Sequence, residues 1–371
     1  MKQKLLRYIT YQTFPAETAN SLQTISNIKY FVKNNFQVEL YFPLREKSSS
    51  SNLDEIKNFY SVEEDFEVFG LSHKFPFGKI KLFKQLWFHL SHFFWSRKNV
   101  KKIIKKNKNS LYFTRSDWVL FFLAKNNKNV IFECHQVTKV RKFVLNRVKN
   151  YQNVKVIFLN EKLSEYFKEL HLNSVILHSG VDVDIFSSFK NVSKKENKII
   201  YVGNLLRFGK KRGLDFIIKA FSESDKLNDY TLEIVGGPRE EVDRLKKIIL
   251  KKKIKNVVIS GRLNRKDTIN KILESNIGIL INSGQDLHSR EFTSPLKYFE
   301  YIYGNLNVLA VDFPSHRVLP YSENITYFKE GDIEDFISSI LEPKKIKKIE
   351  NFENLSLDKR VKEIIKFSTK D

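Results

Sequence analysis

Cysteine is almost absent from this 371-residue chain, which contains only Cys134. A disulfide framework is therefore impossible, and this usage is typical of a reducing compartment. The sequence has no run of about 18 uncharged apolar residues, so no segment is expected to span a bilayer. The residues from Met1 to Thr10 lack the apolar core and small-residue cleavage site of a signal peptide. We expect them to form a first strand, in a cytoplasmic protein.

Acidic residues are also scarce relative to basic ones. The 65 Lys and Arg outnumber the 42 Asp and Glu, which gives a formal net charge of +23. Such a charge favours an anionic partner, of which phosphate, acidic lipid and nucleic acid are three classes. The 42% hydrophobic and 13% aromatic content excludes a disordered or fibrous chain. The length exceeds what one compact core holds and favours two domains.

Short apolar runs alternate with helical patterns along both halves of the chain. We expect strands at 5–10, 36–42, 111–114, 130–133, 154–159, 174–178, 199–202, 230–235, 256–260, 277–281, 307–311 and 325–328. Helices are expected at 18–33, 214–221, 238–252, 266–274 and from 294 onward, and a polar loop at 45–56. This alternation predicts an α/β protein whose parallel sheets carry helices on both faces.

Several expected strands of the C-terminal half end at a glycine, namely Gly203, Gly236 and Gly261. Ligands of open α/β sheets bind outside the carboxyl ends of the strands. A glycine there allows a phosphate or another backbone segment to approach closely. Ordinary turn chemistry also explains a glycine at such a position.

An ordered series of motifs in the C-terminal half carries a family resemblance. The series is Gly180–Phe186 (GVDVDIF), Tyr201–Gly203 with Lys211–Asp215, Leu232–Gly237, Val257–Gly261 and Ser294–Tyr301. In this order the motifs resemble the retaining nucleotide-sugar glycosyltransferases of glycosyltransferase family 4, also called glycosyl transferases group 1. The resemblance covers roughly residues 175–345 and extends only loosely to the N-terminal half.

This resemblance implies the GT-B fold, in which two Rossmann-like domains with parallel sheets face an interdomain cleft. We expect an acceptor-binding domain at 1–186 and a nucleotide-sugar donor-binding domain at 187–345. A C-terminal helical segment at 346–371 is expected to pack back toward the N-terminal domain.

The resemblance further implies a retaining transfer from a nucleotide-diphosphate sugar to a glycan or lipid-linked acceptor, as in bacterial surface polysaccharide, lipopolysaccharide or glycolipid assembly. It implies no cofactor and no catalytic metal, and Asp182 and Asp184 lie in the linker-side motif rather than in a donor-site Asp-x-Asp. Two alternatives stay open. One is a nucleotide-sugar epimerase on the same scaffold, and the other is a non-enzymatic module that binds an anionic polymer.

Glu300 occupies the place at which the family has a glutamate that accepts both ribose hydroxyls of the donor. The alternative is a solvated helix glutamate. The family's first glutamate, eight residues earlier, falls on Phe292 in this chain. Glu291 precedes it, and Glu291 is the candidate to contact the sugar from the loop in place of that glutamate.

The segment ahead of Glu300 is expected to begin a helix, with Ser294 as its N-cap and Pro295 at the first helical position. Free backbone N–H groups and the helix dipole would then hold the donor phosphate. The donor-binding candidates here are Thr293, Ser294, Pro295, Leu296 and Lys297. Lys297 is equally well explained as a surface lysine.

Basic residues follow the expected strand at 199–202, where the family has cations that hold the diphosphate. This strand is followed by Gly203 and Asn204, and a longer loop carries Arg207, Lys211 and Arg212. We expect Arg207 and Lys211 to stabilise the leaving group, with Arg212 in support. In a chain this basic, solvent-facing side chains are the competing interpretation.

In the N-terminal half, His135 follows an expected strand, and the resemblance places it where it donates a hydrogen bond near the donor sugar. A structural loop histidine is the alternative. Cys134 is expected to be a small core residue rather than a nucleophile. The family's glycine-rich loop is missing, and Ala19, Asn20 and Ser21 at the start of the first helix are the acceptor-side candidates.

A segment from Lys79 to Lys108 combines many cations with aromatic residues and contains no acid. Apolar residues beside cations on a helix predict contact with an anionic membrane surface, at the inner face of the plasma membrane. The alternative is a helix whose aromatic residues are core and whose basic end is solvated. No recognised nucleic-acid motif accompanies the charge, so no nucleic-acid partner is expected.

Overall fold

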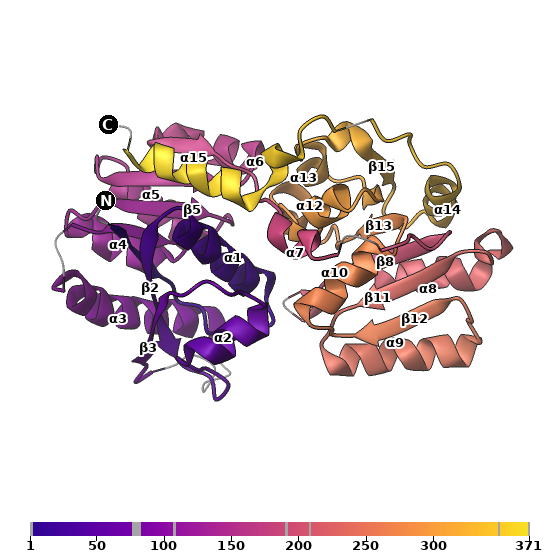
Figure 1. Ribbon diagram of the computed structural model, residues 1–371, viewed down its shortest axis with the longest axis horizontal. Coiled ribbons are helices and arrows are strands. Elements are labelled where there is room, and N and C mark those ends of the chain that lie inside the picture. Colours follow the sequence, from indigo (N-terminus) through magenta and orange to yellow (C-terminus); the bar gives the residue numbers. More distant parts are fainter. Residues whose placement is uncertain are drawn as a thin grey trace. The chain divides into compact units, whose positions relative to one another are not determined.

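The computed structural model describes residues 3–75, 83–106, 109–189, 192–207, 209–347 and 349–369. The chain forms two compact units, of which the first comprises Met1–Leu177 with Val361–Asp371 and the second His178–Arg360 (Figure 1). The expected boundary after residue 186 therefore lies too late in the chain. Residues 178–186 belong to the second unit because Val181 forms a parallel bridge with Ser356 and lies in that unit's core.

The first unit contains a seven-stranded parallel sheet in the order β3-β2-β1-β4-β5-β6-β7. Its strands are β1 (Lys4–Ile9), β2 (Phe36–Leu44), β3 (Glu67–Ser72), β4 (Leu111–Thr114), β5 (Val130–Cys134), β6 (Val154–Phe158) and β7 (Ser174–Ile176). The strand order reverses direction between β1 and β4, which creates a switch point where the connections leave to opposite sides.

Helices connect these strands. They are α1 (Ala19–Lys33), α2 (Leu53–Tyr60), α3 (Lys84–Ile104), α4 (Asp117–Lys125), α5 (Lys139–Val148) and α6 (Glu161–Tyr166), with a 3-10 turn at Lys168–Leu170. Helix α2 begins inside the stretch expected to be a polar loop, because Asn52 caps it by accepting from two backbone N–H groups. The described part of Val361–Asp371 contacts β6, where the Lys155 amine donates to the Phe367 carbonyl over 3.0 Å.

The predicted C-terminal segment at 346–371 is thus divided between the units. Helix α15 (Leu357–Thr369) crosses the division, since residues up to Arg360 belong to the second unit and Val361 begins the return to the first.

The second unit contains a six-stranded parallel sheet in the order β12-β11-β8-β13-β14-β15. Its strands are β8 (Lys198–Val202), β11 (Thr231–Val235), β12 (Val257–Gly261), β13 (Ile277–Leu280), β14 (Asn307–Val311) and β15 (Ile325–Phe328). The loop after β8 is an antiparallel pair of short strands, β9 (Leu206–Arg207) and β10 (Lys210–Lys211). The switch point of this sheet lies between β8 and β13.

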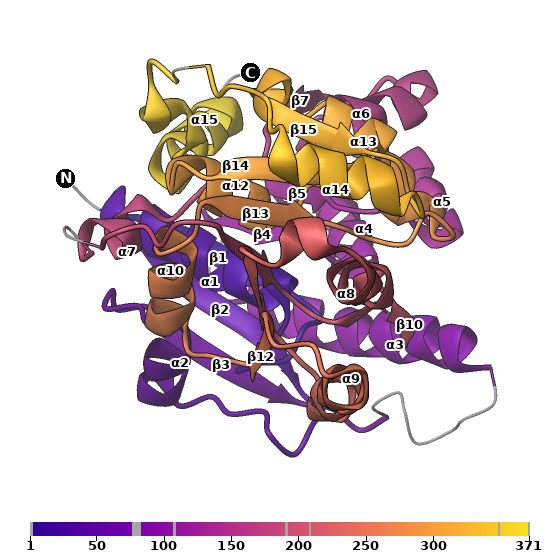
Figure 2. The same ribbon diagram turned by 90° about the vertical axis from the view of Figure 1, so that its right-hand side faces the viewer.

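Both faces of this second sheet are covered by helices. The helices are α7 (Val183–Ser187), α8 (Leu214–Glu223), α9 (Arg239–Lys252), α10 (Arg265–Leu273), α11 (Leu287–Glu291), α12 (Leu296–Tyr303), α13 (Pro314–Arg317) and α14 (Ile333–Leu341), with 3-10 turns at Asp225–Leu227, Ser322–Asn324 and Phe352–Leu355. Figure 2 labels α8, α9, α10 and α12 of this unit. Along β8, Ile199 and Tyr201 pack in one core cluster with residues of α8 and α9, whereas Ile200 packs in the other with α10 and α12. Because both faces of the sheet are buried, the side chains on both sides of its strands are mostly apolar, and the strands read as continuous apolar runs in the sequence.

No helix within the described ranges is both long and apolar enough to cross a membrane.

Two glycines bring the carboxyl ends of β8 and β11 into close contact. A Cβ placed on Gly236 would lie 1.8 Å from the carbonyl oxygen of Gly203, and the φ of Gly236 is +152°. Any side chain at this position would therefore displace backbone as well as strain the main chain. Gly261 also has a positive φ, of +71°, but a Cβ there meets no atom within 4 Å.

Gly236 and Gly261 together give a controlled stability test. We expect G236A to lower the free energy of unfolding by at least about 3 kcal/mol, because backbone strain and steric overlap add. G261A adds only the backbone strain and should lower the free energy of unfolding by about 1–2 kcal/mol. Urea unfolding followed by circular dichroism measures both, and equal losses would contradict the packing described here.

Candidate active site

The switch point of the second sheet gathers polar residues from separate parts of the sequence. Gly203 and Asn204 follow β8, and Asn282 comes shortly after β13. The Asn282 side chain is buried, and its Oδ1 has no hydrogen-bond partner within the described part of the chain. Such orphaned polar atoms at a strand-end edge are typical of a ligand site.

Helix α12 begins one residue later than the sequence indicated. Pro295 is the N-cap rather than the first helical residue, because its ψ of 125° is extended and its carbonyl accepts from the Tyr298 N–H. Ser294 precedes the cap and does not bond the helix. Its Oγ is buried and lacks a hydrogen-bond partner among the residues that the structure describes.

Lys297, in the first turn of α12, is a buried amine. Its Nζ lies 3.7 Å from the centroid of the Tyr201 ring and finds no hydrogen-bond acceptor in the described ranges. Burial lowers the pKa of this amine well below its usual value, and the nearby Arg212 lowers it further while Glu300 opposes the shift. The Nε of Arg212 is likewise buried without a partner among described residues.

Glu300 lies two residues beyond Tyr298 on the same helix and is 5% exposed. Its Oε1 accepts from Nη2 of Arg265 over 2.6 Å, in an ion pair largely shielded from water. Arg265 is the first residue of α10, and sequence reasoning missed it. Nothing distinguishes it in a sequence with 65 basic residues.

Arg207 lies on the β9–β10 hairpin and bonds three side chains from the segment before α12. Its Nε pairs with Asp286 over 2.9 Å, and its Nη1 donates to Ser289 (2.7 Å) and Thr293 (3.3 Å). Burial lowers the pKa of Arg207, and Asp286 opposes this shift. Arg207 thus fixes the hairpin to the loop that leads into α12.

Lys211 and Glu291, two other residues expected in the site, each pair with a charged neighbour. Lys211 is exposed and pairs with Asp215 over 3.2 Å, and Asp215 in turn accepts two bonds from Arg244. Glu291 is partly exposed and accepts from the adjacent Arg290. Phe292, at the expected position of the family's first glutamate, is buried.

In the first unit, Arg115 joins residues that the sequence had singled out separately. It follows β4 at the switch point, and its Nη1 donates to the Asn20 side chain over 2.7 Å. Its Nη2 pairs with Glu133 over 2.5 Å, and the Oε1 of Glu133 lies 2.5 Å from Nε2 of His135. Neither Arg115 nor Glu133 was foreseen, because their roles depend on β4 and β5 being neighbours.

His135 has a defined tautomer in this network. Glu133 is fully buried and paired with Arg115, so it accepts and the His135 Nε2 carries the proton. Burial, with a further contribution from Arg115, lowers the pKa of His135 to about 4. The neutral ring therefore offers its Nδ1 as an acceptor, whereas the sequence-based expectation was a donor.

The remaining N-terminal candidates lie at the start of α1. Ser21 is buried, and its Oγ bonds the Thr18 hydroxyl over 2.6 Å, as part of the helix cap. Ala19 and Asn20 are exposed in the same turn. Cys134 is buried, and burial raises its thiol pKa to about 11, which confirms the expected core role.

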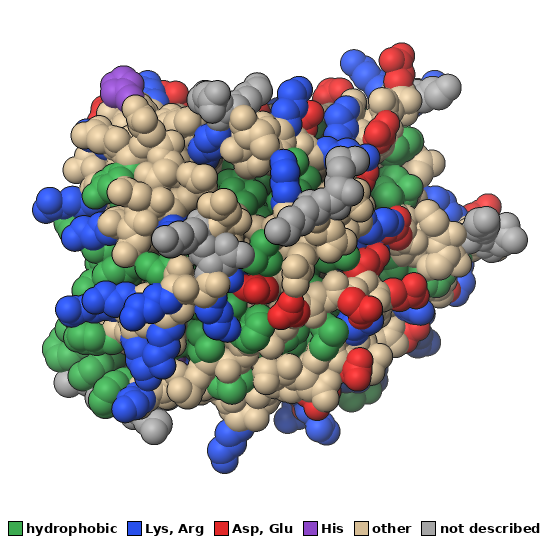
Figure 3. Space-filling model, turned by 60° about the vertical axis from the view of Figure 1, so that its left-hand side comes forward, with side chains coloured by type: hydrophobic (Ala, Val, Ile, Leu, Met, Phe, Trp, Pro, Cys, Tyr) green, Lys and Arg blue, Asp and Glu red, His purple; other side chains and the backbone are tan. Residues whose placement is uncertain are grey.

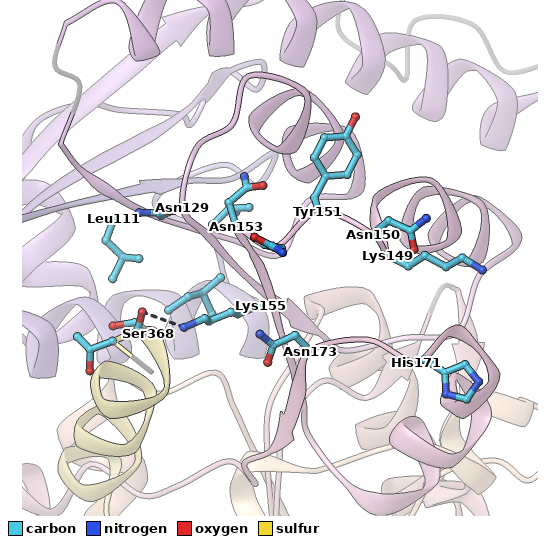
Figure 4. A pocket seen from close by; sticks show the side chains of 14 residues that line it. Leu111, Asn129, Lys149, Asn150, Tyr151, Asn153, Lys155, His171, Asn173 and Ser368 are labelled. Carbon is cyan, nitrogen blue, oxygen red and sulfur yellow. Dashed lines mark hydrogen bonds between the residues drawn. The ribbon is translucent and has the colours of Figure 1, made fainter. Parts of the chain in front are cut away.

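A cavity of about 640 Å³ lies elsewhere in the first unit, at the amino ends of β4 to β7 (Figure 4). Its lining includes Asn129, Asn153, Lys155, Asn173 and Ser368. These residues lie at the strand edge opposite to Arg115 and His135, so this cavity is separate from the candidate site. No three His, Cys, Asp or Glu side chains in the described ranges are placed to hold a metal ion.

Comparison with known proteins finds one family model that resembles part of the second unit. Residues 183–316 match the family model described as Glycosyl transferases group 1. The match covers about a third of the chain and lies within the second unit. It contains the β8–β13 switch point, Arg207, Lys297 and Glu300. No curated protein matches the chain significantly.

Solved structures confirm the GT-B glycosyltransferase fold. A glycosyltransferase from Rickettsia africae is similar with a TM-score of 0.67 at 15% identity, over 99% of this chain and 98% of that one. A mutant of S. aureus TarM, in complex with fondaparinux, alpha-GlcNAc-glycerol and UDP, has a TM-score of 0.66 at 12% identity, over 99% and 100%. The lipopolysaccharide outer core galactosyltransferase WaaB has a TM-score of 0.60 at 12% identity, over 97% and 99%.

The low pKa of His135 should make the folded protein sensitive to acid. Its pKa is lowered from 6.5 to about 4 in the folded state, so the unfolded chain binds the proton more readily below pH 6.5. We expect up to about 3 kcal/mol of stability to be lost as the pH falls from 6.5 to 4. Urea unfolding across this range should show a shallower pH dependence for H135Q than for the wild type.

H171Q removes an exposed imidazole and controls for loss of a histidine as such. If H135Q retained the full wild-type slope, the network around Glu133 would not be the cause of the acid sensitivity.

Proposed function

We propose that this chain is a retaining, metal-independent glycosyltransferase that moves a sugar from a nucleotide-diphosphate donor to a glycan or lipid-linked acceptor. The proposal places it in bacterial surface polysaccharide or glycolipid assembly, at an anionic membrane surface. The observation that carries it is the buried amine of Lys297, which has no hydrogen-bonding partner among the described residues.

An unpaired buried cation is costly, and proteins retain such groups where a ligand completes them. A donor diphosphate supplies the missing charge and acceptor oxygens. The Ser294 hydroxyl and the Arg212 Nε lack partners in the described chain in the same way, and the positive end of the α12 dipole adds to the attraction. We therefore assign the diphosphate to Lys297, Arg212 and the Ser294 hydroxyl.

Glu300 completes the donor site in this proposal by accepting from the ribose hydroxyls. Arg265 contacts only its Oε1 in the structure and holds the carboxylate in a fixed orientation. A pre-oriented carboxylate loses little entropy when it binds a diol. Arg207 serves the same purpose for the loop, since its bonds to Asp286 and Ser289 hold the segment that leads into α12.

The proposed reaction breaks the bond between the anomeric carbon and the phosphate oxygen. A bond from the acceptor oxygen forms on the same face of the sugar, which preserves the anomeric configuration. The departing phosphate oxygen takes the acceptor proton, so no dedicated general base is required. Lys297 and Arg212 stabilise the negative charge that develops on the leaving diphosphate.

The neighbouring structures guide the choice of substrates to test. The TarM complex contains UDP and alpha-GlcNAc-glycerol, and WaaB is described as a lipopolysaccharide galactosyltransferase. UDP-sugars are therefore the first donors to screen, by their stabilisation of the folded protein against heat. Release of an epimerised sugar without any acceptor would instead support the epimerase alternative.

Donor binding is expected to depend on Lys297 and Glu300. K297M should weaken UDP binding by about tenfold to a hundredfold, because an ion pair with phosphate in a buried site is lost. E300Q should weaken UDP binding more than pyrophosphate binding, since only UDP loses the ribose contact, whereas loss of the charge beside Arg265 and Lys297 affects both ligands. Isothermal titration calorimetry measures both, with E291Q as a control on a more exposed carboxylate. Unchanged UDP affinity in K297M would refute the donor-site assignment.

Nucleotide binding should also take up protons. The pKa of Lys297 is lowered well below its usual value by burial, and an adjacent diphosphate raises it again. Affinity should therefore fall as the pH rises, and calorimetry in buffers of different ionisation enthalpy should show net proton uptake. The uptake should disappear in K297M, and equal uptake in that variant would assign the titration to another group.

A further inference from the structure

Helix α3 presents two opposite faces of different character. The buried face packs into the first unit and consists of Ser91, His92, Trp95, Ser96, Asn99, Val100 and Ile103. The exposed apolar residues at or next to its first three turns are Phe83, Leu86, Trp87, Leu90 and Phe94. At 68% and 55% exposure, Phe83 and Phe94 are far outside the core. Their spacing of three and four residues aligns them in one stripe.

The same stripe continues as a row of cations toward the end of the helix. Arg97, Lys98, Lys101 and Lys105 follow Phe94 at helical spacing, and all are exposed. With a rise of about 1.5 Å per residue, the apolar half extends over roughly 16 Å. The outer face of α3 is thus apolar along its first half and basic along its second.

Charge around this stripe is of one sign. The sequence contains no acid between Glu67 and Asp117. Figure 3 shows apolar side chains gathered at the lower left of the view, beside a group of Lys and Arg side chains. Of the basic residues expected to contribute, Lys79, Lys81 and Lys108 lie outside the described residues.

Aromatic residues of α4 and α5 extend the apolar region beside α3. The Phe93 ring contacts Trp118 at 5.0 Å and Phe122 at 5.3 Å between centroids, and Trp118 in turn contacts the exposed Phe143. Cations border this cluster as well, since Arg147 lies 5.3 Å from the Phe143 ring.

We infer that this face, defined as the exposed stripe of α3 with Phe143 of α5 beside it, docks onto an anionic lipid bilayer. The first half of α3 lies in the interface with Phe83, Leu86, Trp87, Leu90 and Phe94 among the acyl chains. The basic second half contacts the phosphate head groups. An apolar stripe continued by lysines and arginines is the arrangement that such an interface requires.

The buried face of α3 connects this docking face to the strand ends of the first unit. Ser91 Oγ donates to the Phe75 carbonyl (2.6 Å) and contacts the hydroxyl of Tyr11 (2.6 Å), which follows β1. Tyr11 also bonds His73 after β3 (2.7 Å), and the Phe75 N–H donates to the Nδ1 of that histidine (3.2 Å). These bonds form a closed ring that fixes α3 to the carboxyl edge of the sheet.

Because of this ring, a bilayer bound to α3 lies at a fixed distance from the carboxyl ends of β1 and β3. This part of the inference rests on the proposed function, in which the acceptor is lipid-linked and reaches the first unit from the bilayer.

The test is binding of the full chain to vesicles. We expect it to sediment with equimolar phosphatidylcholine and phosphatidylglycerol vesicles, and far less with phosphatidylcholine alone. Replacing Lys98, Lys101 and Lys105 by Gln should lower the partition coefficient roughly 100-fold. The triple variant L86Q, L90Q and F94Q should lower it roughly tenfold or more. Brominated lipids should quench tryptophan fluorescence in the wild type and much less in W87F.

Helix α9 of the second unit supplies matched controls. Replacing the exposed Lys246, Lys247 and Lys251 by Gln removes the same charge, and L250Q removes a leucine that is even more exposed than those of α3. These variants should bind vesicles as the wild type does. Equal losses in the α9 and α3 variants, or wild-type binding by the α3 variants, would overturn the docking face. Tight duplex DNA binding through the same α3 lysines, without vesicle binding, would overturn it as well.

Nucleotide binding separates this inference from the proposed function. If the α3 variants bind UDP normally and the chain ignores vesicles, the docking face fails and the donor site stands. If the chain binds anionic vesicles but no nucleotide sugar, the docking face stands and the proposed function fails.

Discussion

The second unit is organised around a buried amine with an incomplete set of partners. Lys297 lies over the Tyr201 ring, and the Arg212 Nε and the Ser294 hydroxyl are likewise buried without hydrogen-bond partners in the described chain. Buried polar groups without partners cost free energy, and in the proposed function a diphosphate would supply the missing partners. The surrounding contacts support this arrangement: Arg207 fixes the loop before α12, and Arg265 fixes Glu300.

The first unit shows the opposite condition at its own switch point. Arg115, Glu133, His135 and Asn20 form a network in which the buried carboxylate is matched by a buried guanidinium. The Arg115 Nε lacks a hydrogen-bond partner among the described residues, but the charges of this network are paired, and such pairing holds side chains in one orientation. The neutral His135 therefore suits contact with a sugar hydroxyl, whereas the unpaired groups around Lys297 suit an anion.

Parallel sheet topology explains why both groups of residues occur where they do. In each sheet the strand order reverses once, at β1 and β4 in the first unit and at β8 and β13 in the second. Loops at these points diverge and leave backbone and side-chain polar groups uncovered. Helix α3 contributes a different kind of surface, because its polar Ser91 faces the strand ends while its apolar stripe faces solvent.

The sequence by itself determined the β-α alternation, the family resemblance and the importance of the Thr293–Glu300 segment, because these are properties of local spacing. It did not indicate α2, β3 or the β9–β10 hairpin, whose patterns are short and mixed in polarity. It placed the start of α12 one residue early, and it missed Arg115, Glu133 and Arg265. Those residues gain their roles only from the pairing of distant strands and helices, and in so basic a chain only tertiary burial distinguishes one cation from the rest.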